Sequence, residues 1–396
     1  MIAPRLFLVA GEPSGDRLGG ALIEGFRAIG VAPDLQGVGG PSMAAAGLAS
    51  RFPMEELSVM GIAEVLPRLP NLLRRIRETA DAVVAMRPDA LVTIDSPDFS
   101  LRVARAARRR LPELRTMHYV APSVWAWRPG RAVKMAAVID HVLALLPFEP
   151  PYMEAAGMTC DFVGHPVAAE PRATSDEVAA LRAELAIGAG QPVLVLLPGS
   201  RRSEVTRLAA VFAAVARRLR AFHPDLAVIV PAAPAVVGML DERMRPDEAG
   251  WPHVLDPRRF DAPAWEARKR AAFAAADVAL AASGTVRLEL AAAGTPMVIA
   301  YDASPLTIFM VRRLMRIDTA TLVNLVTDTR AVPEFLFDRC TDAAITPAVE
   351  TLLVEPEAAA AQRAAGAEAM RLLGRGGEPP GVRAARSVLA HLRRAS

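Results

Sequence analysis

Short runs of continuous apolar residues alternate with segments of helical periodicity along almost the whole chain, and this alternation constrains the fold most. We expect strands at residues 6–10, 90–94, 116–120, 141–146, 193–197, 227–230, 278–281 and 297–300, with helices at about 16–29 and 99–111. Strands that are apolar on both faces need helices on both sides of their sheet. The alternation therefore predicts an α/β protein with parallel sheets.

A break in this alternation near residues 165–190 divides the chain, because His165 closes the first series and Gly188 precedes the second. A length of 396 residues is also typical of about two domains. We therefore expect two Rossmann-like domains, one over residues 1–170 and the other over 175–375.

Composition excludes several functional classes. The net charge of +3 does not favour nucleic-acid binding. Cys160 and Cys340 are the only cysteines and form no C-x-x-C pair, so neither a disulfide framework nor a structural zinc site is expected. The longest apolar stretch, 226–240, is broken by two prolines and is too short to span a bilayer. With no signal-peptide pattern, the chain is expected to be cytoplasmic and soluble.

A glycine-rich turn follows the first strand, where Gly11 and Gly15 flank Glu12 and Ser14. Such glycines let the backbone approach a ligand, and the N-terminus of the next helix favours anions. A tight turn with a helix cap explains the spacing equally well, so both interpretations stay open.

An acidic residue ends the strand at 90–94. Asp95 lies at the carboxyl end of that strand, where open α/β sheets place their ligands. A carboxylate there could deprotonate a hydroxyl nucleophile, which makes Asp95 the candidate general base. Asp98 is interpreted as the N-cap of the following helix.

Two turns in the second half of the chain could hold phosphate. Gly199, Ser200 and Arg201 follow the strand at 193–197 and offer backbone N–H groups, a hydroxyl and a planar guanidinium. The alternative is helix capping, which the spacing from Ser200 to Glu204 also fits.

The second of these turns contains Ser283, Gly284 and Thr285, and Glu289 follows one helical turn later. The Glu289 carboxylate could accept hydrogen bonds from both hydroxyls of a ribose, although a helix start with a solvated glutamate is an equal alternative. Together the two turns predict that the second domain holds a nucleotide diphosphate and the first domain holds the acceptor.

The sequence predicts no metal site and no cofactor. No Asp-x-Asp pair occurs, and the six histidines are scattered without metal-ligand spacing. His118 lies in the expected strand at 116–120; it could be catalytic, but it is interpreted as a hydrogen-bonded structural histidine.

Several longer segments resemble the lipid-A-disaccharide synthase family, in the order in which that family has them. They are 10–16, 59–66, 94–99, 118–127, 145–149, 196–201 and 282–285. The resemblance implies the GT-B glycosyltransferase fold, in which two Rossmann-like domains face a cleft. It also implies that a C-terminal helix near 380–396 completes the first domain.

The resemblance further implies the reaction, which is inverting transfer of 2,3-diacylglucosamine from UDP to 2,3-diacylglucosamine 1-phosphate. The products would be the β-1,6-linked lipid A disaccharide 1-phosphate and UDP. Family roles fall on Asp95 and Glu12 as catalytic residues, with Arg201 and Asn324 contacting UDP. The open alternatives are a UDP-sugar 2-epimerase, a transferase for another lipid-linked acceptor, and a non-catalytic UDP-sugar sensor.

An apolar stripe bordered by arginines lies between residues 59 and 77. Because both implied substrates carry acyl chains, we expect this segment to dock on the inner face of the cytoplasmic membrane. Pro67 and Pro70 predict that its helix starts late, and a stripe facing the domain core is the alternative. The expected membrane or acyl contacts are Met60, Leu66, Leu69, Leu72, Leu73 and Ile76.

Overall fold

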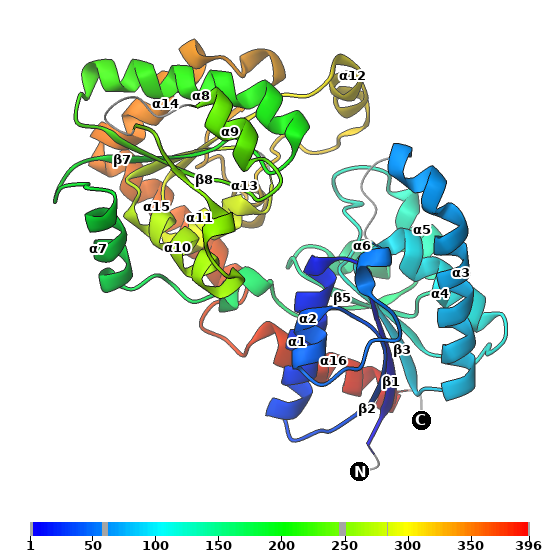
Figure 1. Ribbon diagram of the computed structural model, residues 1–396. Helices are drawn as coiled ribbons and strands as arrows, with labels where there is room; N and C mark the ends of the chain where they lie inside the picture. Colours follow the sequence, from blue (N-terminus) through cyan, green and yellow to red (C-terminus); the bar gives the residue numbers. More distant parts are fainter. Residues whose placement is uncertain (1–2, 58–61, 245–250, 283, 395–396) are drawn as a thin grey trace. The chain divides into compact units, whose positions relative to one another are not determined.

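The computed structural model describes residues 3–57, 62–244, 251–282 and 284–394, and the chain forms two compact units (Figure 1). The first unit is Met1–Ala169 together with Leu373–Ser396, and the second is Glu170–Leu372. Among the described residues, each unit contains one six-stranded sheet in which all pairings are parallel. The predicted α/β class is confirmed.

The sheet of the first unit has the order β2-β1-β3-β4-β5-β6 and is covered by helices on both faces. Its strands are β1 (Arg5–Ala10), β2 (Asp34–Val38), β3 (Ala90–Ile94), β4 (Thr116–Tyr119), β5 (His141–Ala144) and β6 (Thr159–Phe162). Its helices are α1 (Pro13–Ala28), α2 (Pro41–Ala45), α3 (Ile62–Met86), α4 (Pro97–Arg108), α5 (Gly130–Ala136), α6 (Pro150–Glu154) and α16 (Pro380–Arg394).

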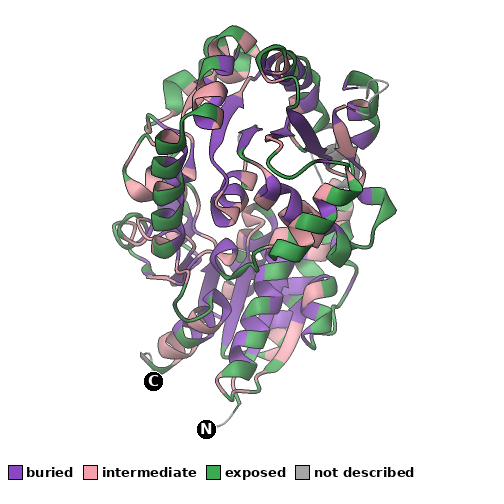
Figure 2. Ribbon diagram, turned by 90° about the vertical axis from the view of Figure 1, so that its left-hand side faces the viewer, coloured by how far each residue is buried: buried purple, intermediate pink, exposed green. Residues whose placement is uncertain are grey.

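Alternation along β1 shows how this sheet is buried. Leu6 and Leu8 pack in one core with side chains of α1 and α16, whereas Phe7 and Val9 pack in another with side chains of α3 and α4. Successive strand residues point to opposite faces, so a continuous apolar run fills both cores at once. Figure 2 shows the result as buried strands (purple) between helices whose outer faces are exposed (green).

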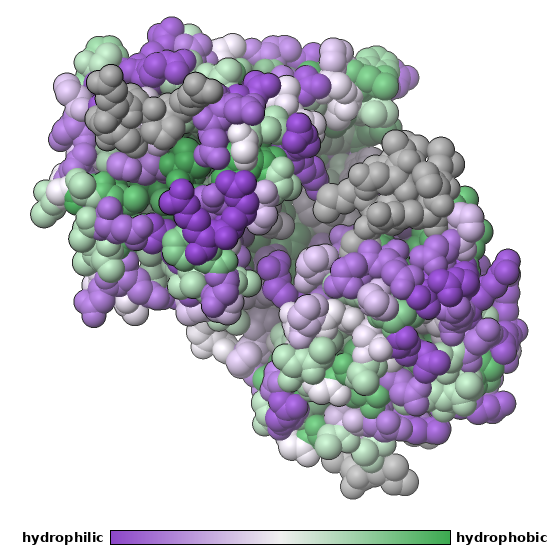
Figure 3. Space-filling view, in the orientation of Figure 1, coloured by the Kyte–Doolittle hydropathy of each residue, from purple (hydrophilic) through white to green (hydrophobic). Residues whose placement is uncertain are grey.

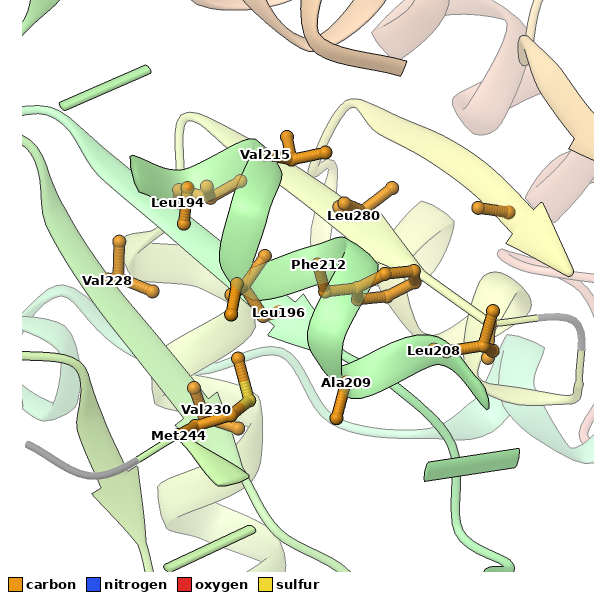
Figure 4. Close-up of a cluster of buried hydrophobic side chains, with 14 of the residues drawn as sticks. Leu194, Leu196, Leu208, Ala209, Phe212, Val215, Val228, Val230, Met244 and Leu280 are labelled. Carbon is orange, nitrogen blue, oxygen red and sulfur yellow. The ribbon is translucent and has the colours of Figure 1, made fainter. Parts of the chain in front are cut away.

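The second unit repeats this plan with the order β12-β11-β10-β7-β8-β9. Its strands are β7 (Val193–Leu197), β8 (Ala227–Pro231), β9 (His253–Leu255), β10 (Val278–Ala281), β11 (Met297–Tyr301) and β12 (Glu334–Leu336). Its helices are α7 (Ser175–Glu184), α8 (Arg202–Phe222), α9 (Val237–Arg243), α10 (Ala262–Ala275), α11 (Val286–Ala293), α12 (Pro305–Leu314), α13 (Leu322–Thr327), α14 (Asp342–Val354) and α15 (Pro356–Leu372). Figure 4 shows Leu208, Phe212 and Val215 of α8 packed over β7, β8 and β10.

Four strands were not expected from the sequence, and the strand orders place all four at sheet edges: β2, β6, β9 and β12. Each has only part of its length buried, so none reads as a continuous apolar run. Edge strands pair on one side only and tolerate polar residues, so they lack the continuous apolar run that indicates a central strand.

Helix α3 begins at Ile62 and continues through Pro67 and Pro70, so the expectation that it starts late is wrong. Each proline removes one backbone donor and crowds the carbonyl one turn earlier, but packing of Ile76 and Val83 into the core stabilises the rest of the 25-residue helix. Among the described residues, no helix is long and apolar enough to cross a membrane.

Each sheet has one position where its strand order reverses. The reversal lies between β1 and β3 in the first unit and between β7 and β10 in the second. Open α/β sheets bind ligands beyond the carboxyl ends of the strands at such positions. All four sequence motifs directly follow one of these four strands.

Candidate functional site

In the first unit, two glycines bring the start of α1 against the end of β3. A Cβ atom on Gly11 would lie 2.8 Å from Ser96 Oγ, and one on Gly15 would lie 2.9 Å from the Ile94 carbonyl oxygen. Neither glycine tolerates a side chain without movement of its neighbour. The turn after β1 is therefore in close contact with the residues that follow β3.

Asp95 occupies this contact in a strained conformation. Its φ is 53° and that of Ser96 is 47°, both in the left-handed region that non-glycine residues rarely adopt. Ser14 Oγ donates to Asp95 Oδ2 at 2.7 Å, and the Ser96 backbone N–H donates to Oδ1 at 2.8 Å. The carboxylate is half-buried and held at both oxygens, so its direction is set before any substrate binds.

The neighbouring acidic residues have different surroundings. Glu12 is the exposed N-cap residue of α1, at the same end of the sheet as Asp95. Asp16 is buried and accepts hydrogen bonds from the backbone N–H groups of Gly40, Ser42 and Met43, so it fixes the start of α2. Asp98 was expected to cap α4, but the N-cap residue is Ser96 and Asp98 lies exposed in the first turn.

His118 is buried at the end of β4, and its Nδ1 lies 2.8 Å from Thr93 Oγ1. Burial lowers the pKa of His118 to about 4, although the nearby Asp95 charge acts in the opposite direction. A neutral, hydrogen-bonded histidine agrees with the structural interpretation of this residue.

Glu149 is a buried carboxylate that sequence analysis did not single out by chemistry. It accepts hydrogen bonds from the indole N–H of Trp125 at 3.2 Å and from the backbone N–H of Leu146 at 3.0 Å. Burial raises the pKa of Glu149 to about 7, against the lowering effect of these donors. Trp125 also packs edge-on against Phe148 at 5.2 Å between ring centroids. The carboxylate thus ties together 118–127 and 145–149, two of the segments on which the family resemblance rests.

A basic pocket of about 620 Å³ lies beside the start of α4. Arg128, Arg131 and Lys134 line it together with Asp98. None of these three cations forms an ion pair with another described residue; Arg128 instead stacks on the Trp127 ring at 4.3 Å. Three cations beside a single carboxylate leave a net positive charge in the pocket, which suits an anionic group. No sequence motif predicted this pocket, because its residues come from α4, from the short helix α5 and from the loop before α5.

In the second unit, one pocket of about 470 Å³ joins the two predicted phosphate turns. The turn after β7 contributes Gly199, Ser200 and Arg201, and the turn after β10 contributes Gly284 and Thr285. Ser283, predicted with them, lies outside the described residues. Because β7 and β10 are neighbours in the sheet, their carboxyl ends place these turns side by side.

In the turn after β7, the backbone donors predicted to bind phosphate are hydrogen-bonded to Glu204, the residue named in the capping alternative. Glu204 Oε2 accepts hydrogen bonds from the backbone N–H groups of Ser200 at 3.0 Å and Arg201 at 3.3 Å. Gly199 has φ of 119°, and a Cβ atom there would lie 2.5 Å from Glu204 Cβ. The carboxylate therefore occupies the donors that were assigned to a phosphate. The Arg201 side chain is 71% exposed and lies 3.5 Å from Glu204.

Lys269 of α10 is a pocket residue that the sequence did not reveal. Its Nζ lies 2.8 Å from Glu289 Oε2 and 2.8 Å from Glu266 Oε2. Burial disfavours the ammonium, but the two carboxylates outweigh it and hold the pKa of Lys269 above its usual value. This ion pair orients Glu289, the residue predicted to accept hydrogen bonds from ribose hydroxyls, and both residues line the pocket.

Asn324, which is predicted to contact UDP, is fully buried, and its amide is engaged within the protein. Its Nδ2 donates to Thr319 Oγ1 at 3.1 Å and to the Val332 carbonyl at 3.0 Å, and its Oδ1 accepts from the Val332 N–H at 3.0 Å. The side chain therefore stabilises the loop between β11 and β12. Arg287, also buried, ties this loop to the pocket, because it donates to the Gly284 carbonyl at 2.7 Å and to the Ala320 carbonyl.

The apolar stripe on α3 divides between core and surface. Ile76 is buried in the core of the first unit and Leu72 packs against it, whereas Leu73 is 38% exposed. Leu69 is half-buried. Met60 lies outside the described residues, as does the Leu66 side chain. Ile76 was expected to contact the membrane, but its side chain is buried in the core. It lies on the same face of α3 as Val83, which packs in the same cluster.

Comparison with known proteins places these features in one family. The family model described as lipid-A-disaccharide synthetase matches residues 6–378. A lipid-A-disaccharide synthase of Ruegeria pomeroyi is 61% identical, over 98% of this chain and 95% of that protein. Another, from Rhodospirillum centenum, is 48% identical over 97% of this chain and 94% of that protein.

Solved structures with the same fold are far less similar in sequence. A UDP-N-acetylglucosamine 2-epimerase of Neisseria meningitidis bound to UDP-GlcNAc has a TM-score of 0.62 at 11% identity, covering 98% of this chain and 99% of that one. A glycosyltransferase of Rickettsia africae has a TM-score of 0.62 at 10% identity, covering all of both chains. These likenesses show the fold, including the two Rossmann-like domains, and do not favour the epimerase alternative over the family match.

Proposed function

The chain belongs to the lipid-A-disaccharide synthetase family, and we propose from this premise how its residues carry out the glycosyl transfer. The enzyme is a glycosyltransferase that moves 2,3-diacylglucosamine from UDP to 2,3-diacylglucosamine 1-phosphate. The observation that supports the proposed residue roles best is Asp95, a strained, doubly hydrogen-bonded carboxylate at the point where the strand order reverses.

Asp95 acts as the general base in this proposal. Inversion at the anomeric carbon requires in-line attack by the acceptor 6-hydroxyl, which must lose its proton. Ser14 and the Ser96 N–H hold both carboxylate oxygens at short distances, so the base needs little reorganisation when the hydroxyl arrives. Glu12, exposed at the adjacent turn, is the candidate to assist or replace it.

The pocket of the second unit binds the UDP part of the donor. Thr285 and Gly284 line it at the start of α11, and Glu289 is oriented by Lys269 toward the ribose hydroxyls. Arg201 supplies the charge that stabilises the leaving diphosphate. Because Glu204 already accepts from the Ser200 and Arg201 N–H groups, the diphosphate must displace this carboxylate to use them.

The basic pocket beside α4 receives the phosphate of the acceptor. Asp98, which lines this pocket, comes three positions after Asp95, so their Cα atoms lie at most roughly 11 Å apart. This span is comparable to the size of one sugar ring with its phosphate. An acceptor phosphate held by Arg128, Arg131 and Lys134 would thus leave the sugar within reach of the base.

Contact with the inner face of the cytoplasmic membrane gives the enzyme access to its lipid substrates. In the first unit, Leu69 and Leu73 are the described residues of the α3 stripe that remain open to such contact. Arg74 and Arg77 border them on the exposed side, where they would favour anionic lipid.

One assay tests the proposed reaction. The purified protein is incubated with the diacylated donor and acceptor, and the products are identified by mass; disaccharide 1-phosphate and UDP are expected in equal amounts. Incubation with UDP-N-acetylglucosamine alone should yield no epimer. A chelator should leave turnover unchanged, since the proposed roles use no metal. UDP binding without any product would instead favour a sensor.

A further inference from the structure

Helix α12 of the second unit has no buried face. It follows β11, and Ser304 caps it by accepting from the Thr307 N–H at 3.3 Å. None of its ten residues is buried. Leu306 is 68% exposed and Phe309 is 63% exposed, although a helix of a globular domain normally turns such residues toward a core.

The exposed apolar residues of α12 form one stripe. Leu306, Met310 and Leu314 are spaced by four residues, and Phe309 lies beside Met310 on the same face. Met310 and Leu314 are each 43% exposed. At the position of α12 in Figure 1, the space-filling view in Figure 3 includes apolar (green) surface. A contiguous exposed apolar stripe marks an interaction surface, unlike single exposed residues.

Positive charge accompanies this stripe. The segment 305–317 contains three arginines and no acidic residue. Arg312 pairs with Asp338, whereas Arg313 and Arg316 are exposed and form no ion pair with another described residue. An apolar face bordered by arginines is complementary to an anionic lipid surface, because the apolar side chains contact acyl chains and the arginines contact anionic headgroups. Ten residues are too few to span a bilayer.

We propose that α12 is an interfacial helix that docks the second unit on an anionic bilayer, with Leu306, Phe309, Met310 and Leu314 inserted. The proposal goes beyond the reaction itself, because it assigns a lipid-facing surface to the unit that binds UDP. It is independent of the α3 contact, which belongs to the first unit. Lipid binding can be measured without turnover. The proposal for α12 can therefore be wrong while the proposed reaction is correct, and the proposed reaction can be wrong while α12 binds lipid.

Vesicle sedimentation tests the proposal. The full-length Leu306→Ser/Phe309→Ser variant is compared with wild type on vesicles of phosphatidylcholine with one-quarter phosphatidylglycerol. We expect its partition coefficient to fall about tenfold or more. The matched control is Phe222→Ser, which removes a phenylalanine of similar exposure (69%) that is not part of a stripe. The comparison of wild-type α12 with the serine variant is repeated in a Leu69→Ser/Leu73→Ser background, so that binding through α3 cannot mask a loss of vesicle binding through α12.

Charge variants provide an independent measurement. Arg313→Gln and Arg316→Gln should each weaken binding to the anionic vesicles by about fivefold and leave binding to pure phosphatidylcholine nearly unchanged. UDP affinity by calorimetry reports whether each variant is folded. Unchanged vesicle binding in both sets overturns the proposal. It is also overturned if the serine variant changes only the monomer–dimer equilibrium in sedimentation velocity, which would assign the stripe to a second copy of the chain.

Discussion

At the scale of single residues, the proposed chemistry depends first on Asp95. Asp95→Asn keeps the shape of the side chain but removes its basicity, so turnover should fall roughly 10²–10⁴-fold. UDP affinity should not change, because the proposed UDP pocket belongs to the second unit. Steady-state kinetics and calorimetry check both values. Asp98→Asn is the matched control and should cost less than tenfold; near-wild-type turnover of Asp95→Asn would move the base to Glu12.

Glu204 and Arg201 should have opposite effects on UDP binding. Glu204→Gln keeps an acceptor oxygen for the Ser200 N–H but removes a negative charge from the diphosphate turn. At about 1 kcal/mol for two charges near 4 Å in water, we expect UDP to bind about fivefold more tightly. Arg201→Ala should weaken binding and slow turnover, whereas Arg202→Ala, one residue later, should do neither. Equal UDP affinity in all three variants by calorimetry would remove both residues from the site.

His118 should make the first unit sensitive to acid. Burial lowers the pKa of His118 to about 4, from about 6.5 in an unfolded chain, so the unfolded state binds the proton more readily. Its contribution is present above pH 6.5 and is lost as the pH falls toward 4, amounting to about 3 kcal/mol. Glu149 has the opposite sign, because burial raises its pKa to about 7 and protonation below that pH favours the folded state.

A comparison of wild type with His118→Asn isolates this residue, since Glu149 is common to both proteins. Asparagine can still reach Thr93 but does not titrate. Denaturant unfolding at pH 7 and pH 4 should show wild type losing more stability than the variant. Parallel losses would mean that His118 is protonated in the folded protein.

At the scale of elements, α3 combines a core face with an exposed face, and serine substitutions should separate them. Ile76→Ser places a hydroxyl in the core and should destabilise the first unit by about 2–5 kcal/mol. Leu73→Ser, at an exposed position of the same helix, should leave the unfolding free energy nearly unchanged and reduce vesicle binding. Equal stability losses in the two variants would show that Leu73 also belongs to the core.

At the scale of the whole molecule, the first unit is assembled from the two ends of the chain. Helices α1 and α16 meet backbone to backbone, since a Cβ atom on Gly25 would lie 2.1 Å from the Gly381 carbonyl oxygen. Gly25→Ala should therefore force the helices apart, destabilise the first unit and abolish turnover while UDP binding persists.

Gly366→Ala is the matched control within α15, because a Cβ atom there has only ordinary contacts of 3.6 Å or more. It should be neutral or slightly stabilising, as alanine favours a helix. Unfolding followed by circular dichroism, with UDP affinity in parallel, checks both variants. Loss of UDP binding in Gly25→Ala would show that the second unit needs the first to fold.

Much of this fold was predictable because the central strands are buried on both faces. Runs such as 90–94 and 193–197 are buried at every position and apolar at all but Thr93, and their bounds agree with β3 and β7. The turns that follow them carry Asp95 and Gly199, so the same pattern also located the candidate site. The edge strands β2, β6, β9 and β12 have no such pattern, and only their pairing with a neighbour makes them strands.

Only the tertiary structure decided how the site residues are engaged. Local sequence shows which donors and acceptors a turn offers, but not which group in the folded chain takes them. Glu204 accepts hydrogen bonds from the backbone N–H groups after β7, and Lys269 of α10 pairs with Glu289 of α11. The Asn324 side chain hydrogen-bonds within its own loop. The physical reason is that hydrogen bonds and ion pairs depend on distances of about 3 Å, which are set by packing between elements far apart in sequence.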